Sequence, residues 1–148
     1  MAIAVRTAET TWEGSLATGN GTIRPASWAL GELPVTWASR TADPGGKTSP
    51  EELAAAAHSS CFAMALALRL GEQQAVADRL TVTATVTLAE EGGIPTIVSS
   101  GLQVRGRVPG LAAAGFQRAV DEAATLCPES RLFAGAEISV TAVLDPAL

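Results

Sequence analysis

The sequence predicts an α+β fold in which two helices are set among short antiparallel strands. Residues 50–70 and 111–126 carry apolar side chains at spacings of three and four, and residues that start and stop helices bound both segments. The segments around them are short and alternate apolar residues with threonine, as half-exposed strands do. The order strands, helix, strands, helix, strand lacks the regular alternation of parallel-sheet proteins. We expect the 148 residues to form a single domain, 1–148.

The first forty residues predict short strands joined by glycine-rich turns. Gly19-Asn20-Gly21 predicts a hairpin, because asparagine and glycine tolerate the positive φ angles of tight turns. A loop rich in aspartate, proline and glycine follows at residues 41–49. The expected strands before this loop are 7–13, 22–29 and 33–39.

A helix is predicted to begin directly after Ser49. Ser49 is a good N-cap, Pro50 suits the first helical position, and Glu52 completes a capping box. Residues that favour helix continue to about residue 70, and Gly71 is the expected stop.

The second half of the sequence predicts a hairpin, a helix and a final strand. Glu91-Gly92-Gly93 is expected to turn the chain between two strands. Pro109-Gly110 opens the second helix, and Pro128 is expected to end it because proline cannot continue a helical hydrogen-bond ladder. The strands expected here are 80–89, 96–108 and 138–144.

The only two cysteines of the chain, Cys61 and Cys127, each fall on the expected apolar side of a helix. The stripe on the first helix consists of Leu53, Ala57, Cys61, Met64 and Leu68. The stripe on the second helix consists of Phe116, Val120, Ala123 and Cys127. Spacing alone leaves two interpretations: inert buried thiols, or a pair that meets in the fold and cycles between dithiol and disulfide.

Composition and charge argue against several classes of protein. Apolar residues make up 47% of the chain and charged residues 17%, which is typical of a globular protein. The formal net charge of −5 and the scattered basic residues argue against nucleic acid or an anionic membrane as a partner. No secretory signal is visible, and His58 and Arg69 interrupt the longest apolar stretch, which reads as too weakly apolar to span a bilayer. We therefore expect a cytoplasmic protein whose thiols rest reduced.

His58 and the cysteines admit other chemistries. His58 lies three residues before Cys61, so it could act as the base of a Cys–His hydrolase, although a lone histidine is more often satisfied structurally. Zinc would need a fourth ligand beside His58, Cys61 and Cys127, and the sequence has no CxxC spacing. No GxGxxG or P-loop pattern predicts a nucleotide site.

Longer motifs resemble one family. Residues 48–66, TSPEELAAAAHSSCFAMAL, resemble the signature helix of the OsmC/Ohr peroxidases, and LCPES at residues 126–130 resembles the second cysteine motif of that family. WEG at residues 12–14 and WASR at residues 37–40 resemble the OsmC branch. The resemblance covers essentially the whole chain, with the motifs in the same order. It therefore favours a redox-active pair of cysteines over two inert buried thiols.

The resemblance implies a fold and a set of site residues. The fold would be OsmC-like, with antiparallel sheets packed around a long central helix, a second helix bearing a cysteine, and an intertwined homodimer with active sites at the subunit interface. Cys61 would be the peroxidatic cysteine and Cys127 the resolving one. Arg40 would be the active-site arginine, and Glu51 the glutamate that holds it.

The resemblance also implies an activity. The family reduces hydroperoxides to alcohols, prefers organic hydroperoxides to hydrogen peroxide, and uses neither a metal nor haem. Its members serve as antioxidants in oxidative and osmotic stress. The disulfide that forms is recycled by an external dithiol such as a dihydrolipoyl protein. A rival from another class is a non-enzymatic module that binds a small apolar ligand at the dimer interface.

Spacing constrains how the implied site is assembled. A guanidinium such as that of Arg40 favours the thiolate form of a neighbouring cysteine, and Glu51 can supply its counter-charge. Glu51 and Cys61 are ten residues apart, which is about 15 Å along one helix. Either the helix breaks between them, or Glu51 and Arg40 reach Cys61 from the partner subunit. We expect the second arrangement.

Overall fold

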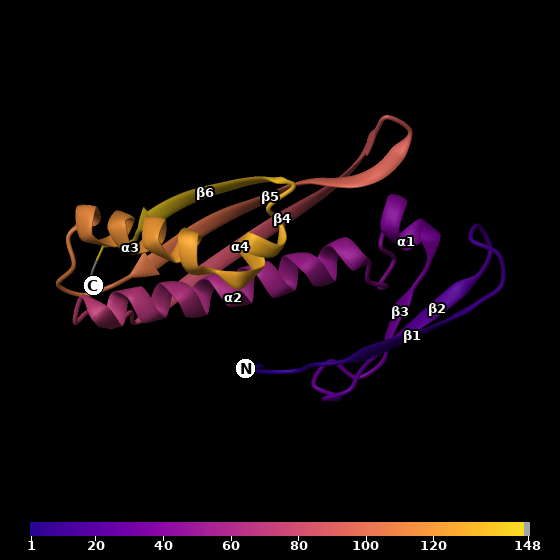
Figure 1. The fold of residues 1–148 in the computed structure, drawn as a ribbon, viewed down its shortest axis with the longest axis horizontal. Coiled ribbons are helices and arrows are strands. Elements are labelled where there is room, and N and C mark those ends of the chain that lie inside the picture. Colours follow the sequence, from indigo (N-terminus) through magenta and orange to yellow (C-terminus); the bar gives the residue numbers. More distant parts are fainter. Residues whose placement is uncertain (147–148) are drawn as a thin grey trace. The chain divides into compact units, whose positions relative to one another are not determined.

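The computed structural model describes residues 1–146, and its contacts divide the chain into two compact units, Met1–Leu53 and Ala54–Leu148. Three strands and a short helix belong to the first unit, and a second three-stranded sheet with helices belongs to the second (Figure 1). The long helix α2 (Pro50–Glu72) begins in the first unit and continues through the second. The α+β class predicted from the sequence is confirmed.

The first unit is a small antiparallel sheet in the order β1 (Ala8–Glu13), β2 (Asn20–Pro25), β3 (Leu33–Val35). The predicted hairpin between β1 and β2 is confirmed, although Asn20 already lies in β2 and the turn precedes it. Among the described residues of this unit, only Ile23 and Val35 are buried hydrophobic side chains. A sheet of this size with so small a core is not expected to be stable by itself.

The predicted strand at residues 33–39 is wrong beyond Val35, because a short helix, α1 (Trp37–Thr41), replaces its second half. A reciprocal capping box starts this helix. The Ser39 backbone N–H donates to the Thr36 hydroxyl at 3.0 Å, and the Thr36 N–H donates to the Ser39 hydroxyl at 2.9 Å. The predicted strand at 22–29 is also too long, since β2 ends at Pro25.

Helix α2 begins as the sequence predicts. The Ser49 hydroxyl accepts from the Glu52 backbone N–H at 3.1 Å. The Glu52 carboxylate accepts from the Thr48 hydroxyl at 2.6 Å instead of closing a capping box. The helix passes Gly71 and is continuous over 23 residues, so no break separates Glu51 from Cys61.

The stripe predicted to be buried on α2 is wrong. Met64 and Leu68 are 68% and 59% exposed, whereas the buried residues of this region are His58, Phe62, Leu66 and Leu70. The helix is apolar on two sides, and the side with the bulkier Phe62 packs into the core of the second unit. By length and composition α2 is apolar enough to cross a membrane, which differs from the expectation that this stretch is too weakly apolar. Core helices of globular proteins share this property.

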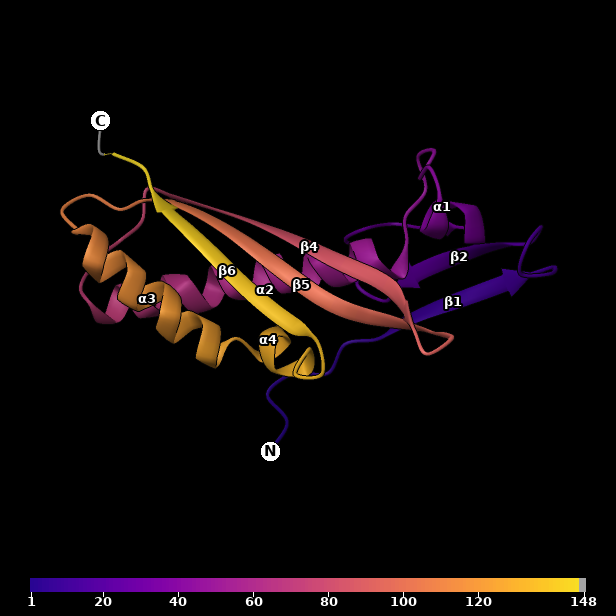
Figure 2. The ribbon, with the colours of Figure 1, turned by 90° about the horizontal axis from the view of Figure 1, so that it is seen from above.

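The sheet of the second unit has the order β4 (Arg79–Glu91), β5 (Ile94–Arg107), β6 (Glu137–Leu144). A turn at Gly92-Gly93 joins β4 to β5 as predicted, with φ angles of 60° and 81°. β6 pairs with β5 in parallel, so the prediction of purely antiparallel sheets is wrong here (Figure 2). The chain returns through α3 (Ala113–Leu126) and α4 (Pro128–Leu132) before β6, and parallel pairing needs such a crossover.

The core of the second unit lies between one face of this sheet and helices α2 and α3. It contains Leu102 and Val104 of β5 together with Phe116 and Val120 of α3. Gly106 permits the close approach of α3, since a Cβ atom there would lie 2.6 Å from the Phe116 ring. The opposite face of the sheet carries mostly polar exposed side chains, because successive residues of a strand point to opposite faces.

Candidate active site

The structure brings the two cysteines together inside the second unit. Cys61 is half-buried in the middle of α2 and packs against the core to which Cys127 belongs. Cys127 is fully buried between α3 and α4, where it ends one helix and precedes the other. The two thiols lie close enough for Cys127 to raise the pKa of the Cys61 thiol, a proximity that two inert core cysteines on separate helices would not require.

Helix α4, which the sequence analysis missed, shapes the surroundings of Cys61. Pro128 does end α3 as predicted, but it also occupies the first position of α4, a position that tolerates the missing N–H of proline. The backbone of Glu129, the next residue, lies near enough to the Cys61 sulfur to lower the pKa of this thiol. Backbone N–H groups in the first turn of a helix have no acceptor within that helix and are therefore free to donate elsewhere.

The second unit alone does not favour the Cys61 thiolate. Burial raises the pKa of the Cys61 thiol, and the hydrogen bond and negative charge of Cys127 and the charge of Glu129 raise it further. The backbone hydrogen bond from Glu129 opposes these effects by lowering the pKa. None of these influences on the Cys61 pKa comes from a cation among residues 54–146. A cation placed beside Cys61 would favour its thiolate form.

His58 is a buried connector between three elements. Its Nδ1 atom lies 2.6 Å from the Ser100 hydroxyl of β5, and its Nε2 atom lies 2.8 Å from the Ser130 hydroxyl of α4. The Phe133 ring lies beside it, 5.3 Å away between ring centroids. Desolvation lowers the pKa of His58, and the charge of Glu129 only partly opposes this effect. Since both ring nitrogens are already engaged, the geometry favours a structural His58 over a base.

Replacing His58 with asparagine is expected to lower stability but to spare thiol reactivity. One of the two serine hydroxyls would lose its partner, at a cost of about 1–3 kcal/mol in the free energy of unfolding. Because the folded-state pKa of His58 is lowered, its contribution to stability is complete above pH 6.5 and is lost as the pH falls below that value. Denaturant unfolding between pH 5 and 8 should show a smaller acid loss in H58N. A collapse in the alkylation rate of Cys61 would instead identify His58 as a base.

Arg40 and Glu51 form a bidentate ion pair in the first unit. Arg40 Nε donates to both Glu51 carboxylate oxygens, at 3.0 and 3.1 Å, and Arg40 Nη2 donates to Oε1 at 2.6 Å. The Glu51 carboxylate is 11% exposed and lies in the first turn of α2, where the helix dipole favours an anion. The Trp37 ring centroid is 6.0 Å from Arg40 Cζ. These contacts hold the guanidinium group of Arg40 in one orientation.

Two residues that the sequence analysis missed help to place Arg40. The buried Ser39 hydroxyl lies 2.9 Å from the Thr48 carbonyl oxygen, which ties α1 to the segment just before α2. Thr36 caps the helix that carries Arg40. The signal was present in the sequence, because a threonine followed three residues later by serine is compatible with a capping box.

An apolar pocket of about 210 Å³ adjoins Arg40 within the first unit. Two tryptophans, Trp12 and Trp37, contribute to its wall. Its complete lining is Thr10, Trp12, Leu16, Ile23, Val35, Thr36, Trp37, Arg40 and Pro50. The pocket therefore combines a hydrophobic interior with a guanidinium at its wall, which suits a molecule with an apolar body and a polar oxygen function.

Comparison with known proteins adds four findings. The family model described as OsmC-like protein matches residues 43–143. The peroxiredoxin OsmC of Escherichia coli K12 is 36% identical over 121 residues, covering 82% of this chain and 84% of that protein. The crystal structure of the organic hydroperoxide resistance protein OhrB of Bacillus subtilis has a TM-score of 0.71 at 27% identity, covering 94% of this chain and 98% of that one. The crystal structure of an organic hydroperoxide resistance protein OsmC from Legionella pneumophila has a TM-score of 0.72 at 21% identity, covering 99% of this chain and 100% of that one. At this identity the likeness supports the fold alone.

Proposed function

The chain belongs to the OsmC-like protein family and is a peroxidase, and on this basis we propose that it reduces organic hydroperoxides to alcohols, with Cys61 as the attacking thiol. Hydrogen peroxide is the poorer substrate. The observation that carries the proposal is the proximity of the half-buried Cys61 to the buried Cys127. A thiol that attacks a peroxide needs access to its substrate, and a thiol that resolves the product needs only access to the first sulfur.

The proposed cycle has three balanced steps. The Cys61 thiolate attacks one oxygen of the hydroperoxide, the O–O bond breaks, and an alcohol leaves after taking up a proton. Cys61 is thereby oxidised to a sulfenic acid. The Cys127 thiol then displaces hydroxide from the Cys61 sulfur, so a disulfide forms and water is released. An external dithiol finally reduces this disulfide and becomes a disulfide itself.

The cation that the first step requires is assigned to Arg40. A guanidinium beside Cys61 lowers the pKa of the thiol and donates hydrogen bonds to the leaving oxygen. Because α2 is continuous, the ten residues between Glu51 and Cys61 correspond to about 15 Å along its axis. Arg40 is held by Glu51, so we assign both residues to the site of the partner subunit. Each active site then contains Cys61 and Cys127 of one protomer and Arg40 and Glu51 of the other.

Exposed apolar surface supports an intertwined homodimer. Met64 and Leu68 of α2 are largely exposed in a single chain, and so is Trp28 in the first unit. Large exposed apolar side chains on one helix are typical of interfaces. The small core of the first unit also supports a dimer, since its sheet needs further packing to be stable. The OsmC-like domain over residues 1–148 would then be completed by a second copy.

The pocket beside Arg40 supports organic hydroperoxides as the preferred substrates. Its interior is dominated by aromatic and aliphatic side chains, including Trp12 and Trp37. Burial of an apolar tail contributes roughly 25 cal/mol per Å², whereas hydrogen peroxide has no tail to bury. The same pocket favours the rival function, a non-enzymatic module that binds an apolar ligand. Titration with peroxide followed by thiol counting separates the two, because a binding module loses no thiols.

The burial of Cys127 determines where the reductant attacks. Cys127 is fully buried, so a dithiol reaches the disulfide at the Cys61 sulfur and releases Cys127 as the leaving thiol. An extended dithiol such as that of a dihydrolipoyl protein fits this geometry. We assign the protein to the cytoplasm, where thiols rest reduced and a dithiol reductant is present.

Replacing Cys127 with serine is expected to leave the first oxidation intact and to block recycling by a dithiol. A serine hydroxyl cannot form a disulfide, so the Cys61 sulfenic acid should persist and react with dimedone. Stopped-flow measurements with cumene hydroperoxide should show consumption of a single equivalent per site, followed by no dithiol-dependent turnover. Turnover at the wild-type rate in C127S would remove Cys127 from the mechanism.

A further inference from the structure

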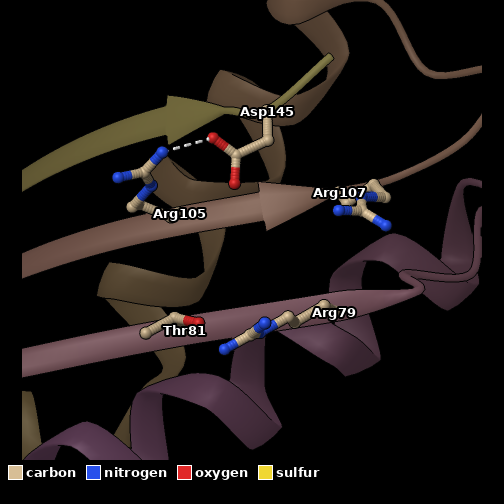
Figure 3. Close-up of a pocket in the computed structure, with 5 residues that line it drawn as sticks. All are labelled: Arg79, Thr81, Arg105, Arg107 and Asp145. Atoms are coloured by element: carbon tan, nitrogen blue, oxygen red, sulfur yellow. Dashed lines mark hydrogen bonds and ion pairs between the residues drawn. The ribbon is translucent and has the colours of Figure 1, made fainter. Parts of the chain in front are cut away.

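The outer face of the second sheet carries a cluster of arginines away from the core. β4 and β5 place Arg79 opposite Arg107 and Thr81 opposite Arg105. Gly106, which lies between the two arginines of β5, faces the core helices, so strand alternation directs Arg105 and Arg107 to the outer face. Figure 3 shows the three arginines on these neighbouring strands.

These residues line a pocket of about 340 Å³, which we call the arginine pocket: Arg79, Thr81, Arg105, Arg107 and Asp145. Asp145 follows β6 and is the single acid of the lining, and its carboxylate accepts from Arg105 at 2.7 Å. The arginine pocket therefore has a formal charge of +2, in a chain whose net charge is −5. The pKa of Asp145 is lowered by the hydrogen bond from Arg105, and the charges of all three arginines add to this effect.

Two of the three arginines lack a direct ion-pair partner among the described residues. Over residues 1–146, neither Arg79 nor Arg107 takes part in an ion pair. The Nε atom of Arg107 is buried and has no hydrogen-bond acceptor among these residues. Like charges directly opposite each other on paired strands destabilise a sheet. Folding by itself therefore gives no reason to place Arg79 opposite Arg107, whereas a bound anion does.

We propose that the arginine pocket binds the dianionic phosphate group of a small molecule. Two unpaired guanidinium groups match two negative charges, and the planar fork of arginine suits the bidentate recognition of phosphate oxygens. The Thr81 hydroxyl adds a neutral donor at the same wall. The site is independent of the peroxide chemistry, because none of its residues belongs to the proposed active site.

Calorimetric titration of the reduced full-length protein with inorganic phosphate, at constant ionic strength, tests this site. The double variant R79Q/R107Q is expected to bind phosphate at least about tenfold more weakly, because both unpaired cations are lost. D145N is expected to bind several-fold more tightly, because a competing negative charge is removed. R118Q is the control, since Arg118 is exposed on α3 outside the arginine pocket; its replacement removes one positive charge, whereas R79Q/R107Q removes two. Phosphate affinity of R118Q should be unchanged, and all variants should keep wild-type peroxidase activity.

Several outcomes would overturn the proposal. The proposal fails if phosphate shows no saturable binding to the wild type, or if R79Q/R107Q binds phosphate as tightly as the wild type. It also fails if R118Q loses as much phosphate affinity as R79Q/R107Q. Equal affinity for succinate would contradict recognition of phosphate in particular. Titration with glycerol phosphate separates two sources of the ligand: affinity at least equal to that for inorganic phosphate supports a phosphate ester, and binding of inorganic phosphate alone supports the free anion.

Discussion

Replacing Cys61 with serine is expected to abolish turnover of organic hydroperoxides. A serine hydroxyl is far less nucleophilic than a thiolate and cannot form a sulfenic acid, so the rate should fall on the order of a thousandfold or more. The side chains are nearly equal in size and Cys61 is only half-buried, so the fold should persist. The measurement is steady-state consumption of cumene hydroperoxide with dihydrolipoamide as the reductant.

A neighbouring serine provides the control for this experiment. The Ser60 hydroxyl bonds only to backbone carbonyls of the preceding turn, including that of Ala56 at 2.8 Å, so S60A should retain wild-type activity. If C61S still consumed cumene hydroperoxide at the normal rate, Cys61 would not be the peroxidatic residue. Ester hydrolysis that needs Cys61 and His58 but neither peroxide nor Cys127 would instead support the hydrolase interpretation.

Replacing Arg40 with alanine is expected to lower the peroxidase rate by roughly 10²–10³-fold, the range that follows loss of a group stabilising developing charge. The sharper test mixes R40A subunits with C61S subunits. If Arg40 acts across the dimer, each heterodimer has one site that combines an intact Cys61 with an intact Arg40. Activity should therefore return to about one working site per heterodimer, measured after the mixed subunits have exchanged.

Controls make the mixing experiment decisive. A protein carrying both R40A and C61S on one chain, mixed with wild-type chains, leaves one working site per heterodimer only if the two residues act within one subunit. Arg24 is a matched arginine of the same unit, whose ion pair with Glu32 at 2.6 Å is partly solvent-exposed, so R24A should retain activity. Absence of any recovered activity in the R40A and C61S mixture would contradict a site shared between subunits.

Local signals predicted most of the secondary structure, and the errors have identifiable causes. Ser49 and Pro50 marked the start of α2 because capping depends on neighbouring residues only. Pro128 both ends α3 and occupies the first position of α4, and the sequence analysis predicted only the end of α3. The direction of β6 depends on the path of the crossover, which no residue of the strand encodes. The buried side of α2 was ambiguous because Phe62 and Cys61 lie on adjacent apolar sides.

The candidate site could be predicted only in part. The period of the second helix placed Cys127 in the core, where the structure has it. The family motifs named Arg40 and Glu51, and the structure contains a bidentate ion pair between them. The pocket beside Arg40 required the tertiary arrangement, because its walls come from strands and a helix far apart in sequence. The double engagement of His58 likewise depends on Ser100 and Ser130, which no spacing rule connects to it.

The proximity of Cys61 and Cys127 also has a consequence for chain entropy. A covalent bond between these positions closes a loop of about 66 residues, which contains the entire β4–β5 hairpin and α3. Restricting an unfolded chain in this way stabilises the folded state by on the order of 4 kcal/mol. The proposed cycle would thus alternate between a looser reduced molecule and a cross-linked oxidised one that resists unfolding. The reductant would restore conformational freedom to the chain as well as its thiols.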